Sequence, residues 1–178
     1  MNKELILMKK LWFLFWLLVL VLFVAACSHT QEPKTTTEAV ISQLSKEEFD
    51  NVGTTGLNNP KKDDFLKFTF NFEVEHAANI TRKVEFPKRK SWKEAVNSID
   101  DKDRFWFGEG YEENSDGENF ARYKSEFVFY SKGLNEEEIR KAFNSITLKL
   151  YLDIEEGETF EKEYQVSDLV KFNNNQSS

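Results

Sequence analysis

Residues 66–75 read LKFTFNFEVE, and apolar and polar side chains alternate over the whole stretch. The apolar positions are Leu66, Phe68, Phe70, Phe72 and Val74. Successive side chains of a β-strand point to opposite faces, so this pattern gives one apolar face and one polar face. The stretch therefore predicts a half-buried strand, and with it a fold built from sheets.

Similar alternation marks a second pair of strands near the end of the chain. Residues 146–154 place five apolar side chains on one face, and Glu-Glu-Gly-Glu at 155–158 predicts a turn. The chain then returns with Phe160, Tyr164 and Val166 on the inner side. This pattern predicts a β-hairpin.

Two further regions have strand character. Residues 80–86 alternate as well, with Arg82 as the one polar residue on the inner face. Residues 104–111 and 120–130 are aromatic-rich and flank an acidic segment that contains Asp116-Gly117, a favoured turn pair. We expect these two stretches to form a hairpin with a long acidic tip.

Three short helices are indicated by their capping residues. Asn135 with Glu138 fits a capping box and predicts a helix over 135–144. Ser91 followed by Glu94 predicts a helical turn over 91–96, with Trp92 covering the end of the sheets. Ser45 with Glu48 predicts another turn, before a loop at 51–64 that is rich in Gly, Asn and Asp.

The expected fold is mainly β, with one or two short helices. One-sided alternation leaves every sheet with an apolar face to bury, and two antiparallel sheets packed face to face bury both. We therefore predict an immunoglobulin-like antiparallel β-sandwich over residues 45–178, with 173–178 disordered. A small open barrel, or an α+β sheet with helices on one face, is the alternative. The chain has one cysteine, so the core must hold together without a disulfide.

The N-terminal segment has a different character from the rest. Residues 11–26 are apolar throughout and follow a short start that contains Lys3, Lys9 and Lys10. Sixteen apolar residues fall short of the roughly 20 that a membrane-spanning helix needs. A basic start, an apolar stretch and small residues at its end are typical of a secretory signal peptide, which we assign to residues 1–26.

The signal segment ends in Val24-Ala25-Ala26-Cys27, which resembles the lipobox of bacterial lipoproteins. The resemblance implies cleavage between Ala26 and Cys27 and a thioether from the Cys27 sulfur to diacylglycerol. It also implies attachment to the cell membrane on its extracytoplasmic face. The mature part resembles, in composition, the small uncharacterised immunoglobulin-like lipoproteins of Gram-positive bacteria. Residues 27–44 begin polar and Thr-rich, and we expect the lipidated cysteine and a flexible tether there.

Charge and residue types limit the function. Residues 1–26 hold three Lys and one Glu, so their removal changes the net charge from −7 to −9. Such a chain is repelled by phosphates, which argues against a nucleic-acid partner. The sequence shows no nucleophile–base motif and no cluster of His and Cys. We expect a non-catalytic module with a partner in the envelope or cell wall; the alternatives are a hydrolase using paired carboxylates and a calcium-stabilised adhesion-type module.

Two sets of residues are candidates for binding. Glu112, Asn114 and Asp116 match the first half of a calcium loop, although Tyr123 stands where the bidentate Glu is expected. A cofactor is otherwise not expected. Trp106, Tyr130 and Tyr151 are predicted on outer faces, where aromatic side chains form either a binding surface or ordinary packing under a helix or loop.

Overall fold

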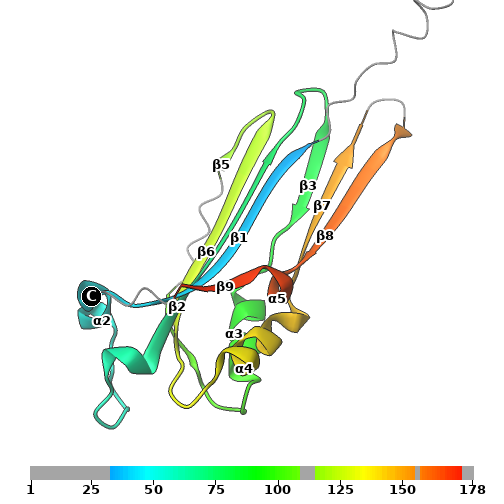
Figure 1. Ribbon diagram of the computed structural model, residues 1–178. Helices are drawn as coiled ribbons and strands as arrows, with labels where there is room; N and C mark the ends of the chain where they lie inside the picture. Colours follow the sequence, from blue (N-terminus) through cyan, green and yellow to red (C-terminus); the bar gives the residue numbers. More distant parts are fainter. Residues whose placement is uncertain (1–32, 109–114, 155–156, 174–178) are drawn as a thin grey trace, which may run out of the picture. The chain divides into compact units, whose positions relative to one another are not determined.

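A computed structural model describes residues 33–108, 115–154 and 157–173. This part of the chain is mainly β, with two antiparallel-rich sheets and short helices (Figure 1). The larger sheet has the order β4-β6-β2-β1-β9, with β5 also paired to β6, and the smaller sheet has the order β3-β7-β8. The strands of the larger sheet are β1 Lys34–Gln43, β2 Phe65–Glu75, β4 Phe105–Phe107, β5 Ser115–Asp116, β6 Phe120–Tyr130 and β9 Val170–Asn173. Those of the smaller sheet are β3 Thr81–Glu85, β7 Thr147–Asp153 and β8 Thr159–Gln165.

Strand β2 confirms the strand predicted at residues 66–75. Four of the five alternating apolar side chains are fully buried: Phe68, Phe70, Phe72 and Val74. The strand is central in its sheet, because it pairs antiparallel with β1 on one side and with β6 on the other. The aromatic face that the sequence predicts therefore forms one side of the main hydrophobic core.

The C-terminal hairpin is also confirmed. Strands β7 and β8 pair antiparallel, and Leu148, Leu150 and Leu152 are fully buried in the same core as the β2 face. Tyr164 of β8 reaches across to the larger sheet, where its hydroxyl donates to the Thr35 side chain of β1 at 2.6 Å. The two sheets thus share one core.

The prediction of a tether over residues 27–44 is wrong from residue 34 onward. Residues 34–43 form β1, which pairs with β2 along its full length and with β9 over its second half. Ala39, Ile41 and the following Leu44 are buried. Thr and Val have branched side chains that suit a half-buried strand, and this outweighs the polar composition.

The prediction for the end of the domain also needs correction. Disorder was expected from residue 173, yet Asn173 closes β9, and residues 174–178 lie outside the described part. Strand β9 follows the short helix α5 (Val166–Leu169) and runs parallel to β1. Parallel pairing needs a distant partner rather than a hairpin, so the local pattern gave no indication of it.

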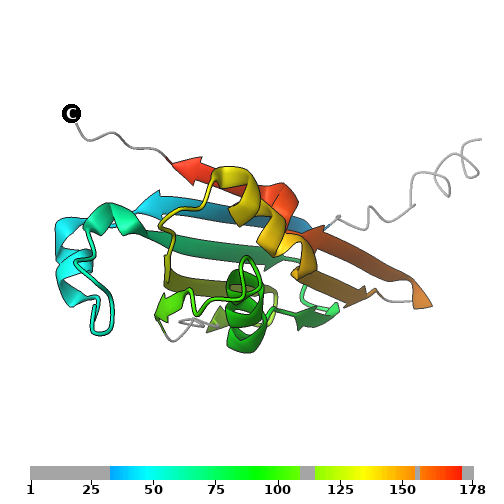
Figure 2. The same cartoon turned by 90° about the horizontal axis from the view of Figure 1, so that it is seen from below.

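Helices cover the part of the core that the smaller sheet leaves open (Figure 2). They are α3 Arg89–Asn97, α4 Glu136–Ala142 and the 3-10 turn Phe143–Ser145; α2 Lys46–Asn51 and the 3-10 turn Lys62–Asp64 lie elsewhere. Trp92 of α3 is fully buried, and its ring lies 5.2 Å from that of Phe68, while the Phe143 ring stacks on Phe68 at 4.6 Å. At the other end of the same face, the Phe72 ring lies 5.7 Å from that of Tyr164. One face of the larger sheet is therefore covered partly by a sheet, as predicted, and partly by helices, as in the alternative.

The helix starts follow the predicted capping boxes in two of three cases. Asn135 accepts from the Glu138 N–H at 3.0 Å and donates its own N–H to the Glu138 carboxylate at 2.9 Å. Ser45 and Glu48 make the same reciprocal pair. Helix α3, however, begins at Arg89 after Lys88, so Ser91 lies inside the helix and caps nothing.

The second strand of the hairpin predicted at 104–111 and 120–130 is confirmed as β6. The first strand, β4, is shorter than predicted. Strand β4 covers only three residues, and its register with β6 shifts between Phe105 and Phe107. The Asp116-Gly117 pair does not form the centre of the turn. Instead β5 pairs with β6, and the Gly117 N–H donates to the Phe120 carbonyl at 2.9 Å.

Within the described residues, no helix is both long enough and apolar enough to span a bilayer.

Ser125 is a polar residue in the apolar core. It lies on β6 opposite Phe70, is 1% exposed, and its hydroxyl has no hydrogen-bond partner in the described part of the chain. A buried hydroxyl without a partner costs roughly 1–3 kcal/mol. We expect Ser125→Ala to raise the free energy of unfolding by about 1 kcal/mol, measured by urea denaturation.

Ser131 provides the matched control for that measurement. It is also buried, but its hydroxyl donates to the Asp64 carbonyl at 3.2 Å. Ser131→Ala should therefore lower the free energy of unfolding by about 1 kcal/mol. A loss of stability in both variants would contradict the assignment of Ser125 as an unpaired group.

Candidate functional site

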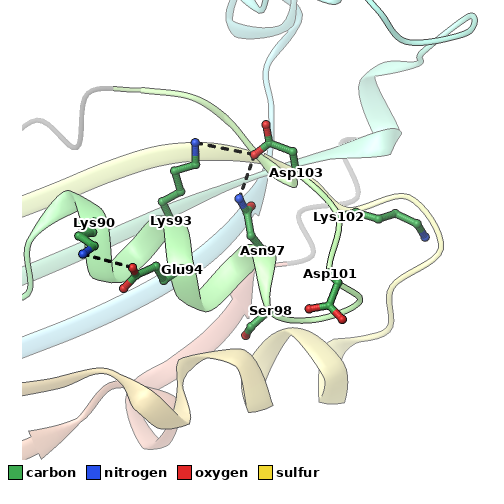
Figure 3. Close-up of a pocket in the computed structure, with 8 residues that line it drawn as sticks. All are labelled: Lys90, Lys93, Glu94, Asn97, Ser98, Asp101, Lys102 and Asp103. Atoms are coloured by element: carbon green, nitrogen blue, oxygen red, sulfur yellow. Dashed lines mark hydrogen bonds and ion pairs between the residues drawn. The ribbon is translucent and has the colours of Figure 1, made fainter.

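A shallow depression lies beside α3 (Figure 3). It has a volume of about 700 Å³, and its walls are α3 and the loop that follows it. The lining residues are Lys90, Lys93, Glu94, Asn97, Ser98, Asp101, Lys102 and Asp103. The helix supplies one wall because its buried face, with Trp92, faces the core and its charged face is left to solvent.

The charged groups of the depression are largely paired with one another. Lys90 and Glu94 are one helical turn apart with an N–O distance of 3.6 Å, and the Lys93 ammonium lies 3.9 Å from Asp103. Figure 3 shows Asp103 between Lys93 and the Asn97 amide, which donates to it at 2.9 Å. The depression therefore presents both signs of charge rather than one, and this suits a polar, zwitterionic or mixed-charge group better than a simple anion.

Asn97 fixes the depression to the sheet. Its side-chain oxygen accepts the backbone N–H groups of Arg104 and Phe105, at 2.9 and 2.8 Å. The last residue of α3 is thus tied to the first residue of β4, so that the intervening loop is closed at its base.

Arg104 holds the far side of the same loop. Its side chain is buried, and its guanidinium donates to both oxygens of Asp100 at 2.7 and 2.8 Å. It also donates to the carbonyls of Tyr130 at 2.8 Å and Lys132 at 3.3 Å. One side chain therefore joins the loop, the end of β6 and the turn before α4.

The Arg104 guanidinium, helped by Lys102, holds the pKa of the Asp100 carboxyl well below its usual range. A carboxyl whose pKa is lower in the folded state stabilises the fold above its unfolded pKa of about 4. That contribution is lost as the pH falls below about 4 towards the folded pKa. The loop should therefore loosen in acid.

We expect Arg104→Met to lower the free energy of unfolding by about 2–5 kcal/mol, because two carbonyls lose their donor in a buried place. The variant should also lose part of the decline in stability below pH 4, since Asp100 no longer has its main partner. Urea denaturation at several pH values measures both effects. Lys102→Met is the control: it removes the exposed partner of Asp100 at 2.6 Å and should change stability little. An equal loss in both variants would show that the buried guanidinium has no special role.

The chemistry of the depression shows no assembled catalytic group. Ser98 is the only hydroxyl-bearing residue of its lining, and that hydroxyl donates to the Ala95 carbonyl at 2.7 Å. Among the described residues, no group of three or more His, Cys, Asp or Glu side chains is placed to hold a metal ion.

No family model, curated protein or solved structure matches this chain. Its site must therefore be judged from its own geometry.

The aromatic residues predicted on outer faces lie in two different places. Trp106 and Tyr130 belong to a small cluster on the outer face of the larger sheet, with ring centroids 6.3 Å apart. Both pack on Phe65, and the Trp106 indole N–H donates to the Gly53 carbonyl of the segment that covers them. This contact is the packing under a loop that the sequence left open as an alternative.

Tyr151 is separate from that cluster. It lies on β7 of the smaller sheet, half-buried, with the Lys83 ammonium 5.1 Å from the centre of its ring. The structure therefore brings together two of the three predicted aromatic residues and leaves the third on the other sheet.

The predicted calcium ligands fall mostly outside the described residues. Glu112 and Asn114 lie there, as do Ala26 and Cys27. Asp116 is described at the backbone level only, in β5 opposite Ala121. The calcium site thus stays a prediction.

Sequence reasoning missed the residues that build the depression. The sequence pattern placed Arg104 at the start of the strand predicted at 104–111, and it predicted no role for Asn97 or for the pairing of Asp100 with Arg104. The available signal was the run Asp100-Asp101-Lys102-Asp103-Arg104, in which charges of both signs are dense. That run did not identify the partners, because the carbonyls that Arg104 binds lie 26 and 28 residues further along the chain.

Proposed function

We propose that the chain is a lipid-anchored module of the cell envelope, held on the extracytoplasmic face of the membrane and acting without catalysis. The observation that carries the proposal is Cys27 at the end of the apolar segment, directly after Val24-Ala25-Ala26. The resemblance to a lipobox gives the one cysteine of the chain a role, as the site of lipid attachment. The two acyl chains of one diacylglycerol make a stable anchor, whereas a single chain holds a protein only marginally.

The start of the folded domain supports this assignment. Strand β1 begins at Lys34, so six residues separate it from Cys27. A chain of this length spans at most about 25 Å when fully extended. The domain would thus stay close to the lipid surface, as expected for a module that supports or binds another component of the envelope. The mixed-charge depression beside α3 is the best candidate for the place where a partner binds.

We propose further that the domain is immunoglobulin-like. The support is the strand order, in which β1, β2, β6 and β4 are neighbours in one sheet and β3, β7 and β8 in the other. With the two-residue β5 left out, lettering the strands A to G in chain order gives A-B-E-D and C-F-G, the order of immunoglobulin constant domains. Strands β5 and β9 are additions to that pattern, and helices α3 and α4 occupy the connections between strands of different sheets.

The anchor is tested by Cys27→Ser in cells that process lipoproteins. The expected result is loss of the chain from the membrane fraction, loss of radioactive palmitate incorporation and loss of the mass of the lipid. His29→Gln is the matched control and should keep all three. The double variant Cys27→Ser, Gln31→Cys moves the thiol four residues and should not restore lipidation, because the small residues no longer precede it. Membrane attachment and palmitate incorporation that survive Cys27→Ser would refute the proposal.

A further inference from the structure

The end of the domain where β1 begins carries an exposed aromatic side chain. Phe120 is 40% exposed, and it is the one large apolar side chain of the described residues that is exposed to this degree. It opens β6, directly after the turn that follows β5. Figure 1 shows the start of β1, the turn between β2 and β3, and the turn between β5 and β6 at the same end of the domain.

The sheet register measures how close Phe120 is to the start of β1. Lys34 is opposite Glu75 in one strand pair, and Glu75 is opposite Phe120 in the next. Lys34 and Phe120 are thus two strand spacings apart, a backbone distance of about 10 Å. The opposite end of β6, at Tyr130, is ten residues away, or about 34 Å.

The turn that carries Phe120 is held firmly by its neighbours. The His76 N–H donates to the Asn119 carbonyl at 2.9 Å, and the Arg82 guanidinium donates to the Gly117 carbonyl at 3.2 Å. The ring of Phe120 folds over Gly117, where a Cβ atom would lie 2.5 Å from the ring. The aromatic side chain is thus fixed in position on the surface, which lowers the entropy that docking would cost.

We propose that Phe120 docks on the lipid surface that carries the anchor, so that this end of the domain faces the membrane. The inference rests on the proposed anchoring at Cys27, since a lead of at most about 25 Å brings the start of β1, and Phe120 beside it, to the bilayer interface. The opposite end of the domain, at Tyr130, reaches the membrane surface only if the strands run parallel to that surface. Docking leaves the depression beside α3 directed away from the membrane, open to a partner.

The charges near Phe120 decide which lipid is the proper probe. Lys34 and Glu75, which lie beside Phe120 across the sheet, are both exposed and form an ion pair at 4.0 Å. The turn before Phe120 adds a further exposed carboxylate, that of Glu118. A carboxylate beside the ring is repelled by anionic headgroups, so zwitterionic phosphatidylcholine isolates the apolar contribution.

The experiment uses the full lipidated chain in phosphatidylcholine vesicles that contain doxyl-labelled phosphatidylcholine as a quencher. Because the Cys27 sulfur is occupied by lipid, Asn79→Cys supplies the only free thiol for a fluorophore, in the turn between β2 and β3. Lys132→Cys, near the end of β6, is the matched probe at the opposite end. We expect strong quenching at position 79 and little at position 132.

Substitution of Phe120 then tests its own contribution. Burying the exposed part of a Phe ring should change the ratio of docked to undocked domain about fivefold. Phe120→Ser should therefore lower the docked-to-undocked ratio at position 79 by about that factor, while Phe120→Leu should retain it. An unchanged thermal midpoint shows that the fold is intact, and Phe120→Glu serves as a second polar variant if Phe120→Ser is unstable.

The two proposals fail in different ways. If the chain floats with the vesicles, the anchoring stands, and the docking is judged from the quenching. Equal quenching at positions 79 and 132, or quenching at position 79 that is unchanged by Phe120→Ser, would overturn the docking. A chain that does not float and lacks the mass of the lipid overturns the anchoring, and the docking with it.

Discussion

A chain that begins at Leu44 is expected not to fold, whereas a chain that begins at Pro33 should be as stable as one that begins at Cys27. The difference is β1, which is paired with β2 over ten residues and with β9 over four. Without it, the inner side chains of β2 lose their neighbours Ala39 and Ile41, and both β2 and β9 become open edges. Far-ultraviolet circular dichroism and urea denaturation of the two chains measure the effect.

A single substitution separates the loss of the strand from a general effect of truncation. Ile41→Asp places a charge in the buried face of β1, and it should unfold the domain or nearly so, because a buried unpaired charge is very costly. Thr36→Asp changes an exposed position of the same strand and should be tolerated. A stable, cooperatively folded chain starting at Leu44 would restore the tether that the composition of residues 27–44 suggests.

Trp92→Ala should have the largest effect of any single truncation in the core. The indole lies within 6.2 Å, between ring centres, of Phe68, Phe70, Phe127 and Phe143. Its N–H donates to the Pro87 carbonyl at 3.1 Å, in a buried place. Removal of a buried Trp side chain costs about 3–5 kcal/mol, and the unpaired carbonyl adds to this cost.

Trp106→Ala is the natural comparison, since it removes the other Trp of the described chain. Trp106 is half-buried on the outer face and borders a small cluster, so its loss should cost clearly less than that of Trp92. Trp92→Phe should fall between the two, because the ring contacts survive in part. Urea denaturation of the three variants gives the order, and a larger loss for Trp106→Ala would contradict the position of the core.

Local physics was enough to predict the elements whose pattern is strong. Strand β2 has five alternating apolar residues, and β7 has a row of Leu, so one face had to be buried. Helix α4 is marked by Asn135 and Glu138, whose side chains satisfy the free backbone N–H groups at its start. In each case the signal is contained within a dozen residues.

Strand β1 could not be recognised in the same way, because its partners are distant. Its inner positions are Thr35, Thr37, Ala39 and Ile41, which are only weakly apolar as a set. Ala39 and Ile41 are fully buried and the two Thr side chains half-buried, because β2 lies opposite and a second sheet covers this face. The Thr-rich composition that suggested a tether is also compatible with a strand, since branched side chains fit a pleated surface.

Two buried or half-buried polar side chains also have partners that are distant in the sequence. Arg82 interrupts the inner face of β3, and the structure shows why: its guanidinium reaches His76 and the Gly117 carbonyl, which joins two turns. Arg104 is similar, since its partners come from three segments. The sequence indicates that such residues are unusual, but their partners are defined only by the assembled fold.

If the chain is exported as proposed, the pairing of β1 with β9 has a consequence for how it folds. The first and the last strand of the described residues are neighbours, with Ala39 opposite Val170 and Ser42 opposite Asn173. A chain that crosses a membrane from its N-terminus delivers β1 early, and the second edge of this strand stays unpaired until β9 has crossed as well. Contacts so distant in sequence make folding slow. The free edge of β1 is open to wrong partners during that interval, until β9 pairs with it.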